Sequence, residues 1–238
     1  MKKVRTSKSL VNKPIKINKD LYEYVFKTAQ KTAEIICQRI EKSDVDEGGI
    51  ALVFGPQSSG KSLVGMNLIE CFNHNGRKVV AAQPWIDRPD VPENKLFSRS
   101  GYEMKAISFK DKKDIEKILH DYDVVVIDEA QFTPANLQSY LIKELKLFRD
   151  RGGWAVALGL LYTSLGTEFL ITDVIKETSD MVFEIKSTCQ MCGRKNARYN
   201  QRLVNGKPAA VTSPELMPPS PQVQYEPRCG DCYIIVGG

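Results

Sequence analysis

The 238-residue sequence has no apolar run near the roughly 20 residues that a membrane-spanning helix needs. It also lacks the charged segment followed by an apolar segment that is typical of a secretion signal. We therefore expect neither an integral membrane protein nor a secreted one, and we predict a cytoplasmic protein. Apolar residues make up 42% of the chain and charged residues 26%, an ordinary composition that argues against global disorder.

Acidic residues are missing from positions 1–19, which hold seven lysines and arginines. The net charge of +5 therefore belongs to this segment, since the rest of the chain has 27 basic against 29 acidic residues. Such a segment is typical of a flexible solvated tail rather than of a nucleic-acid-binding core. Behind it, apolar residues recur at helical spacing and predict an amphipathic helix over 20–42, packed on the core or at a subunit contact. They are Leu21, Val25, Ala29, Ala33, Ile36 and Ile40.

Short apolar runs alternate with helical patterns in the middle of the chain, which is typical of parallel βαβ units. The prolines of 84–100 predict a mobile loop there. The prolines of 205–227 predict that this segment forms neither a long helix nor a central strand. The predicted strands are 50–54, 78–82, 124–127 and 154–161, and the predicted helices are 61–73, a segment including 115–120, and 137–150.

The residues GPQSSGKS fit the phosphate-loop pattern G-x-x-x-x-G-K-[ST] and lie between a predicted strand and a predicted helix. Backbone N–H groups of such a loop wrap phosphates, and the helix dipole adds positive potential. We expect Lys61 to reach the β- and γ-phosphates of a nucleoside triphosphate and Ser62 to bind Mg²⁺. The predicted nucleotide-binding residues of this loop are Gly55, Pro56, Gln57, Ser58, Ser59, Gly60, Lys61 and Ser62.

Two carboxylates, Asp128 and Glu129, directly follow the predicted strand 124–127. Ligands of open α/β sheets bind at the carboxyl ends of strands. Asp128 would hold Mg²⁺ directly or through water, and Glu129 could polarise a nucleophile. With the loop, this pair predicts transfer or hydrolysis of the γ-phosphoryl group, without indicating the acceptor.

Two C-x-x-C pairs, Cys189 with Cys192 and Cys229 with Cys232, suit a tetrahedral structural Zn²⁺ site. Zinc is favoured over disulfides because the chain looks cytosolic. Four thiolates leave no open position for a catalytic zinc. The remaining cysteines, interpreted as ordinary buried thiols in helices, are Cys37 and Cys71.

These motifs predict an α/β fold with a parallel sheet of the P-loop NTPase type flanked by helices, and a small zinc-bound carboxy-terminal domain. The zinc would pin both ends of a proline-rich loop that can cover a substrate. The predicted division is 1–47 for the basic tail and helix, 48–186 for the P-loop core and 187–238 for the zinc-binding domain.

Over about residues 49–236 the sequence resembles the type II thymidine kinase family, P-loop kinases with a zinc-held lasso. The matching stretches are GPQSSGKS, SRSGYEMKAI (98–107), DEAQF (128–132), GL (159–160), CQMCGRKNARYNQRLVNGKPA (189–209) and YEPRCGDC (225–232). The resemblance implies transfer of the ATP γ-phosphoryl group to the 5′-hydroxyl of a deoxynucleoside, in DNA precursor salvage. It also implies a cytosolic homotetramer that is inhibited by the triphosphate end product. We expect a nucleoside substrate and no membrane partner, and the sequence disfavours a nucleic-acid partner.

By matching positions, the resemblance implies that Glu129 is the base on that hydroxyl. It also implies a catalytic role for Arg88 and places Gln131, Asp128 and the nucleotide-binding residues of the phosphate loop beside ATP. The nucleoside-binding residues that it implies are Gln57, Phe132, Leu160, Phe169, Asn200 and Tyr225.

The sequence departs from the family pattern around the base pocket. Gln57 stands where the family usually has Met, Ser164 replaces a Phe and Asn200 replaces a Thr. Each change makes the pocket more polar, so a 5-modified deoxyuridine is an alternative substrate to thymidine.

Two other functions stay open on the sequence. A P-loop ATPase with a nucleic-acid-binding zinc module would need a basic, aromatic-rich ribbon, but only Tyr199 and Tyr225 are aromatic between Cys189 and Cys232. A regulator that has lost activity is disfavoured by the intact phosphate loop and carboxylate pair.

Overall fold

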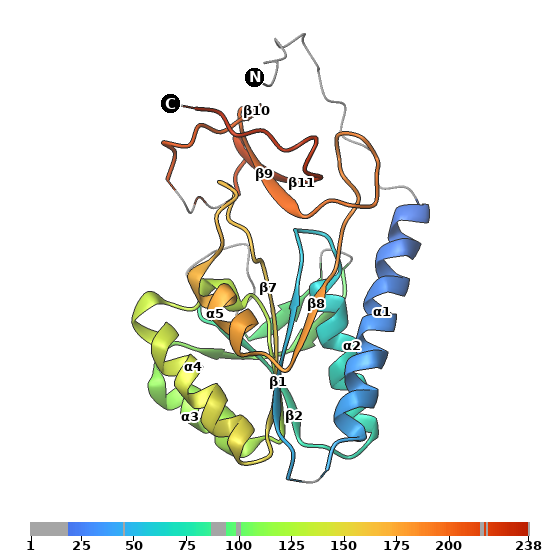
Figure 1. Ribbon diagram of the computed structural model, residues 1–238, viewed down its shortest axis with the longest axis vertical. Coiled ribbons are helices and arrows are strands. Elements are labelled where there is room, and N and C mark those ends of the chain that lie inside the picture. Colours follow the sequence, from blue (N-terminus) through green and yellow to red (C-terminus); the bar gives the residue numbers. More distant parts are fainter. Residues whose placement is uncertain are drawn as a thin grey trace.

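The structure, a computed structural model, describes residues 19–44, 46–86, 94–98, 101–214, 217 and 219–237. A six-stranded sheet lies between two helical layers, with α1 and α2 on one face and α3, α4 and α5 on the other (Figure 1). The helices are α1 Lys19–Glu41, α2 Lys61–His74, α3 Lys112–Asp121, α4 Ala135–Asp150 and α5 Leu170–Thr178.

The sheet is parallel throughout, in the order β5-β2-β6-β7-β1-β8. Its central strands are buried along their whole length, which is why they read as continuous apolar runs. The strands are β1 Gly49–Phe54, β2 Val79–Pro84, β5 Ile107–Phe109, β6 Val124–Ile127, β7 Trp154–Gly159 and β8 Met181–Glu184.

The helices and strands predicted from periodicity are confirmed, with shifts of a few residues at their ends. The predicted loop over 84–100 is partly wrong, because β3 (Lys95–Phe97) pairs antiparallel with β4 (Glu103–Lys105). Within that range, residues 87–93, 99 and 100 lie outside the described part of the chain. The sequence analysis also missed the short elements β5, β8 and α5.

Each face of the sheet is covered by its own apolar cluster. On one face, α1 and α2 cover side chains such as Val53 and Val126, and on the other, α3, α4 and α5 cover side chains such as Leu52 and Ile127. Burial on both sides holds the sheet rigid and keeps the carboxyl ends of its strands at a fixed edge.

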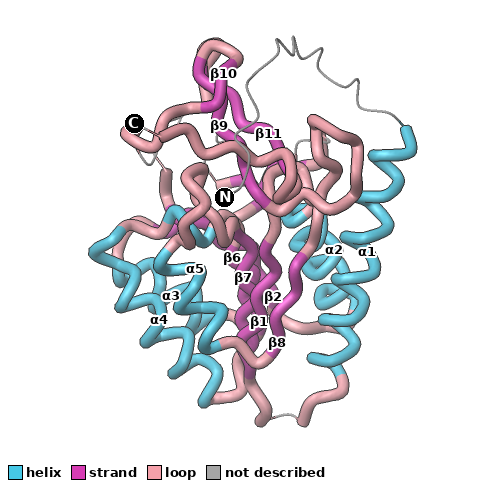
Figure 2. The backbone as a smooth tube through the Cα atoms, turned by 45° about the horizontal axis from the view of Figure 1, so that its top comes forward, coloured by secondary structure: helices cyan, strands magenta, loops and turns pink. Residues whose placement is uncertain are grey.

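A smaller three-stranded antiparallel sheet lies above that edge (Figures 1 and 2). It consists of β9 (Tyr199–Val204) flanked by β10 (Lys207–Pro208) and β11 (Val223–Arg228). Pro208 and Pro227 lie in the two flanking strands, and Pro214, Pro219 and Pro221 lie between them, which fits the expectation that 205–227 forms no central strand. The predicted fold class is thus confirmed: a helix-flanked parallel sheet with a small cysteine-bearing carboxy-terminal domain.

A disulfide joins Cys37 of α1 to Cys71 of α2. The interpretation of these residues as ordinary thiols is therefore wrong. The sequence places both in helices, but it does not reveal that the two helices pack side by side with these cysteines facing each other, their Cα atoms 6.7 Å apart. The crosslink fixes α1 to the helix that follows the phosphate loop.

We expect alkylation of the denatured, metal-free protein to modify four cysteines without reductant and six after reduction. The bridge spans 34 residues, so its loss through Cys37→Ser with Cys71→Ser should lower the free energy of unfolding by about 4 kcal/mol. A phosphine reductant should lower the melting temperature of the wild type and leave that of the double variant unchanged. Six modified cysteines without reductant would contradict the disulfide.

Candidate active site

The phosphate loop connects β1 to α2 and contains two positions, Gly55 and Gly60, where its geometry requires glycine. A Cβ atom at Gly55 would lie 2.1 Å from the backbone oxygen of Ile185, so a side chain there would clash with the backbone directly after β8. Gly60, directly before α2, has a φ of 97°, a left-handed conformation that glycine adopts without strain. The loop therefore turns tightly and points its backbone toward the space where phosphates bind.

Lys61 is almost fully buried at the first position of α2. Its ammonium donates hydrogen bonds to the carbonyl oxygens of Gly55 (2.9 Å) and Pro56 (2.8 Å). Ser59 also donates to the oxygen of Pro56, at 2.8 Å. The loop is thus closed around a positive charge that can reach a bound phosphate by a small side-chain movement.

Ser62 links the phosphate loop to the first carboxylate. Its hydroxyl donates to Oδ2 of Asp128 at 2.9 Å, which joins α2 to the end of β6. The other carboxylate oxygen, Oδ1, is buried and has no hydrogen-bond partner among the described residues. An unpaired buried acceptor beside a serine hydroxyl is the donor set that Mg²⁺ prefers, so these residues fit the ion.

Burial raises the pKa of Asp128 to about 7, and the nearby charge of Glu129 adds to this. The hydrogen bond from Ser62 and the charge of Lys61 act in the opposite direction but do not cancel the effect. A bound cation would favour the ionised carboxylate. The site therefore holds a buried carboxylate whose charge Lys61 and Ser62 offset only in part.

Glu129 follows with a φ of 52°, a left-handed conformation that costs a non-glycine residue on the order of 1–3 kcal/mol. Its Oε2 accepts a hydrogen bond of 2.5 Å from Nε2 of Gln131, and Oε1 of Gln131 accepts from the backbone N–H of Leu160 at 2.9 Å. We predicted Gln131 at the ATP site, whereas this buried side chain bridges Glu129 and the end of β7. Nothing in the sequence distinguishes these two uses of a glutamine.

Apolar residues expected in the base pocket lie close to this bridge. The rings of Phe132 and Phe169 meet edge to face with centroids 6.4 Å apart. Phe132 ends the 3₁₀ turn η1 (Ala130–Phe132), and Phe169 directly precedes α5. The structure therefore brings these two rings together next to Glu129 and Gln131.

Of the two lasso residues predicted to bind the nucleoside, Asn200 is hydrogen-bonded to the phosphate loop and Tyr225 to another part of the lasso. Oδ1 of Asn200 accepts a hydrogen bond of 2.7 Å from the backbone N–H of Gln57. Ser187 donates to the oxygen of Ser58 at 3.1 Å, a contact that the sequence did not reveal. The hydroxyl of Tyr225 donates to the oxygen of Met217 at 2.6 Å and so fixes the segment between β10 and β11. Arg88, a predicted catalytic residue, lies outside the described residues.

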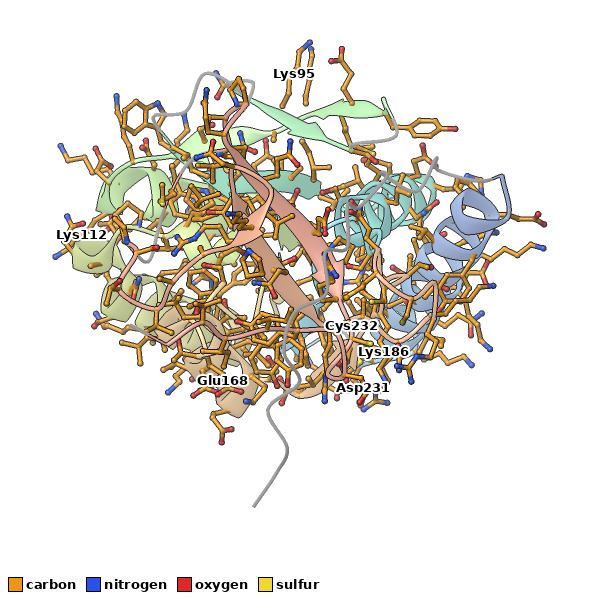
Figure 3. All side chains as sticks on the ribbon, turned by 90° about the horizontal axis from the view of Figure 1, so that it is seen from above. Lys95, Lys112, Glu168, Lys186, Asp231 and Cys232 are labelled. Carbon is orange, nitrogen blue, oxygen red and sulfur yellow. A yellow bond between two sulfur atoms is a disulfide. The ribbon has the colours of Figure 1, made fainter. Side chains whose placement is uncertain are left out.

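The four predicted zinc ligands converge. The Sγ atoms of Cys189, Cys192, Cys229 and Cys232 all lie within 4.8 Å of one another, and those of Cys192 and Cys229 are 3.7 Å apart. Tetrahedral zinc with Zn–S bonds of about 2.3 Å separates its sulfurs by about 3.8 Å, so the cluster fits this ion. Figure 3 looks down on this part of the molecule and labels Cys232.

Arg194 lies against this cluster. Its guanidinium donates to Sγ of Cys192 at 3.3 Å and to Asp231 at 2.6 Å. The hydrogen bond from Arg194 lowers the pKa of the Cys192 thiol to about 6, toward the thiolate form that binds metal. Burial raises the pKa of the Cys232 thiol to about 12, so Arg194 would offset the negative charge of four thiolates only once a metal ion has displaced their protons.

Comparisons with known proteins agree with this site. A sequence model of the family described as thymidine kinase matches residues 48–233, well over half of the chain. A thymidine kinase from Pyrobaculum aerophilum is 30% identical over 191 residues, which cover 78% of this chain and 98% of that relative. The chain belongs to the thymidine kinase family. It is thus an ATP-dependent nucleoside kinase of the thymidine kinase type, as the motif resemblance implied.

Two solved structures share a weaker likeness with this family member. The Pif1 helicase from Candida albicans has a TM-score of 0.40 at 15% identity, covering 64% of this chain and 38% of that one. A DNA replication initiation factor has a TM-score of 0.42 at 8% identity, covering 68% and 46%. This chain spans less than half the length of each of these two proteins, and TM-scores of this size support no conclusion about function. No helix in the described segments is long and apolar enough to cross a membrane.

We expect the purified protein to contain close to one Zn²⁺ per chain, measured by atomic emission. Cys229→Ser removes a buried ligand and should reduce the zinc content and raise the KM for the nucleoside, because the lasso loses its clamp. The matched control is the disulfide variant Cys71→Ser, which should keep its zinc. A metal-free protein with a normal nucleoside KM would contradict the zinc site.

Proposed function

We propose that this member of the thymidine kinase family transfers the γ-phosphoryl group of ATP to the 5′-hydroxyl of thymidine or a related deoxypyrimidine nucleoside, with Glu129 as the base. The observation that carries this proposal is the hydrogen bond between Ser62 and Asp128. It joins the phosphate loop to the strand end that bears Glu129, so phosphate-binding groups and a candidate base share one edge of the sheet.

In this proposal the phosphate loop binds the phosphates of ATP through the backbone N–H groups of Ser58–Ser62, since the N–H groups of Gly55 and Gln57 already donate within the protein. Lys61 leaves the carbonyl oxygens of Gly55 and Pro56 and stabilises the negative charge of the transferred group. Ser62 and Asp128 would hold Mg²⁺, which neutralises phosphate charge when bound.

Glu129 would accept the proton of the 5′-hydroxyl as the new P–O bond forms and the bond from the γ-phosphorus to the bridging oxygen breaks, which releases ADP. Its partner Gln131 donates to one carboxylate oxygen and leaves the other for the hydroxyl. We therefore assign Gln131 the role of a positioning residue, anchored by the backbone of Leu160. Arg88 stays a proposed catalytic residue on the family resemblance alone.

The nucleoside base would lie against Leu160, Phe132 and Phe169, with the lasso above it. Asn200 supports this arrangement because its contact with Gln57 holds β9 to the phosphate loop. Tyr225 supports it by fixing the segment that would cover the base. The lasso thus closes over a pocket whose floor is rigid.

The same proposal includes the remaining features of the family. We propose a cytoplasmic homotetramer that serves DNA precursor synthesis and is inhibited by its triphosphate end product. We also propose the division into a tail and helix (1–47), a kinase core (48–186) and a lasso domain (187–238).

The nucleic-acid alternative has little support. Tyr199 stacks on Tyr233 with centroids 4.8 Å apart, and Tyr225 is bonded to Met217. The tyrosines of the lasso are therefore engaged within the lasso, whereas single-stranded nucleic acid needs aromatic faces that are open for stacking.

Glu129→Gln should lower kcat about 10²- to 10⁴-fold, because the amide cannot accept the hydroxyl proton. The dissociation constant for ATP should change little, since the residue does not belong to the phosphate loop. Glu168→Gln is the matched control: this exposed glutamate lies in the neighbouring loop and pairs with Lys176. A kcat for Glu129→Gln near that of the control would remove Glu129 from the mechanism.

A second candidate substrate is a deoxyuridine with a polar 5-substituent. It is favoured by the buried hydroxyl of Ser164, which has no hydrogen-bond partner in the described part of the chain, at a position where the family has Phe. An unpaired buried polar group costs about 1–3 kcal/mol, which a polar substituent could offset. Gln57 adds a second polar group where the family has Met.

The test is the ratio of kcat/KM for thymidine to that for 5-hydroxymethyldeoxyuridine. Gln57→Met should shift this ratio toward thymidine about 10- to 100-fold, because the methyl group then meets an apolar side chain. Gln38→Met, on the exposed face of α1, should leave the ratio unchanged. An unchanged ratio in Gln57→Met would exclude the polar-pocket alternative.

A further inference from the structure

Helix α1 lies outside the residues that the family model matches, 48–233, yet it packs along the outer side of α2 (Figures 1 and 2). At its carboxy-terminal half, the disulfide between Cys37 and Cys71 fixes it to α2. An ion pair between Glu41 and Arg77 adds a contact of 3.5 Å near the same end. This half of the helix is therefore held firmly against the core.

The amino-terminal half of α1 reaches the phosphate loop. A Cβ atom at Gly60 would lie 2.9 Å from Cγ1 of Val25 and 3.4 Å from the Cβ of Ala29. The Cα of Gly60 therefore faces α1 directly, at the left-handed residue that immediately precedes Lys61. Ala29 is fully buried there, so α1 leaves this side of the loop no room to move.

The opposite side of the loop is held by the lasso. Ser187 donates to the backbone oxygen of Ser58, and Asn200 accepts from the backbone N–H of Gln57. Tyr24, which directly precedes Val25 in α1, reaches the lasso itself, where Nζ of Lys195 lies 4.6 Å from the centre of its ring. One turn of α1 thus contacts both the phosphate loop and the segment between the two cysteine pairs.

We propose that the segment Tyr24–Ala29 of α1 is a positioning element for the phosphate loop, with Val25 as its main contact. By blocking displacement of Gly60, Val25 keeps Lys61 and Ser62 aligned for the phosphates of ATP. The disulfide anchors the helix at the far end, so that this contact is preserved. The proposal rests on the nucleotide-binding role of the loop, and it adds a residue that the family pattern does not contain.

The experiment compares Val25→Ala with Val79→Ala. Val79 lies at the amino end of β2, away from the phosphate loop, and is a partly buried valine packed against the same apolar cluster as Val25. Both variants lose the same atoms from the same core, so their melting temperatures should fall by similar amounts. The dissociation constant of a non-hydrolysable ATP analogue with Mg²⁺ is measured by calorimetry, together with kcat and the KM values for ATP and nucleoside.

Val25→Ala should raise the dissociation constant of the analogue and the KM for ATP about 3- to 10-fold and leave the KM for the nucleoside within about 2-fold. Val79→Ala should leave all three constants within about 2-fold. Equal nucleotide affinity in the two variants would overturn the proposal. Because the analogue is not turned over, this result is independent of the phosphoryl acceptor: a wild type that binds the analogue but phosphorylates no deoxynucleoside would refute the proposed function alone.

Discussion

The site depends on one buried carboxylate. Asp128 ends the central strand β6, accepts a hydrogen bond from Ser62 through Oδ2, and leaves Oδ1 without a partner among the described residues. Its pKa of about 7 in the folded protein lies above the ordinary value of 3.8, so folding takes up a proton between these pH values. The contribution of this group to stability therefore falls as the pH rises toward 7, where the carboxylate becomes a buried charge that Lys61 offsets only in part. A magnesium ion with ATP would offset the rest.

The phosphate loop around this carboxylate is held from two directions. On one side, Gly60 lies against α1. On the other side, the backbone of Gln57 and of Ser58 is hydrogen-bonded to the lasso. The four-cysteine cluster, which could hold zinc, brings the two ends of the lasso together, and the disulfide fixes α1 to α2. Both of the elements that touch the phosphate loop are thus restrained at a distance from it.

The sequence was most informative where the physics is local. A buried strand such as β6 reads as a continuous apolar run, and the phosphate loop reads as glycines before a lysine, because each pattern follows from its own segment. Short elements such as β3 were missed, since three residues carry too little periodicity. The four zinc cysteines were predicted because paired spacing encodes the site locally.

What could not be predicted depends on which segments meet. The disulfide between Cys37 and Cys71 requires α1 to lie on α2, and the bridge made by Gln131 requires the end of β7 to lie beside Glu129. A similar limit explains why Asn200 was interpreted only as a pocket residue. Its hydrogen bond to the phosphate loop joins positions 143 residues apart.

The measurement that tests the central claim most directly is the melting temperature of Asp128→Asn at pH 8, with and without Mg²⁺ and ATP. An amide removes the partly compensated buried charge, so the nucleotide-free variant should be more stable than the wild type by about 1–3 kcal/mol. The wild type should gain stability from Mg²⁺ with ATP, and the variant should lose most of that gain. A nucleotide-free variant that is no more stable than the wild type, with an equal gain from Mg²⁺ and ATP, would contradict the account.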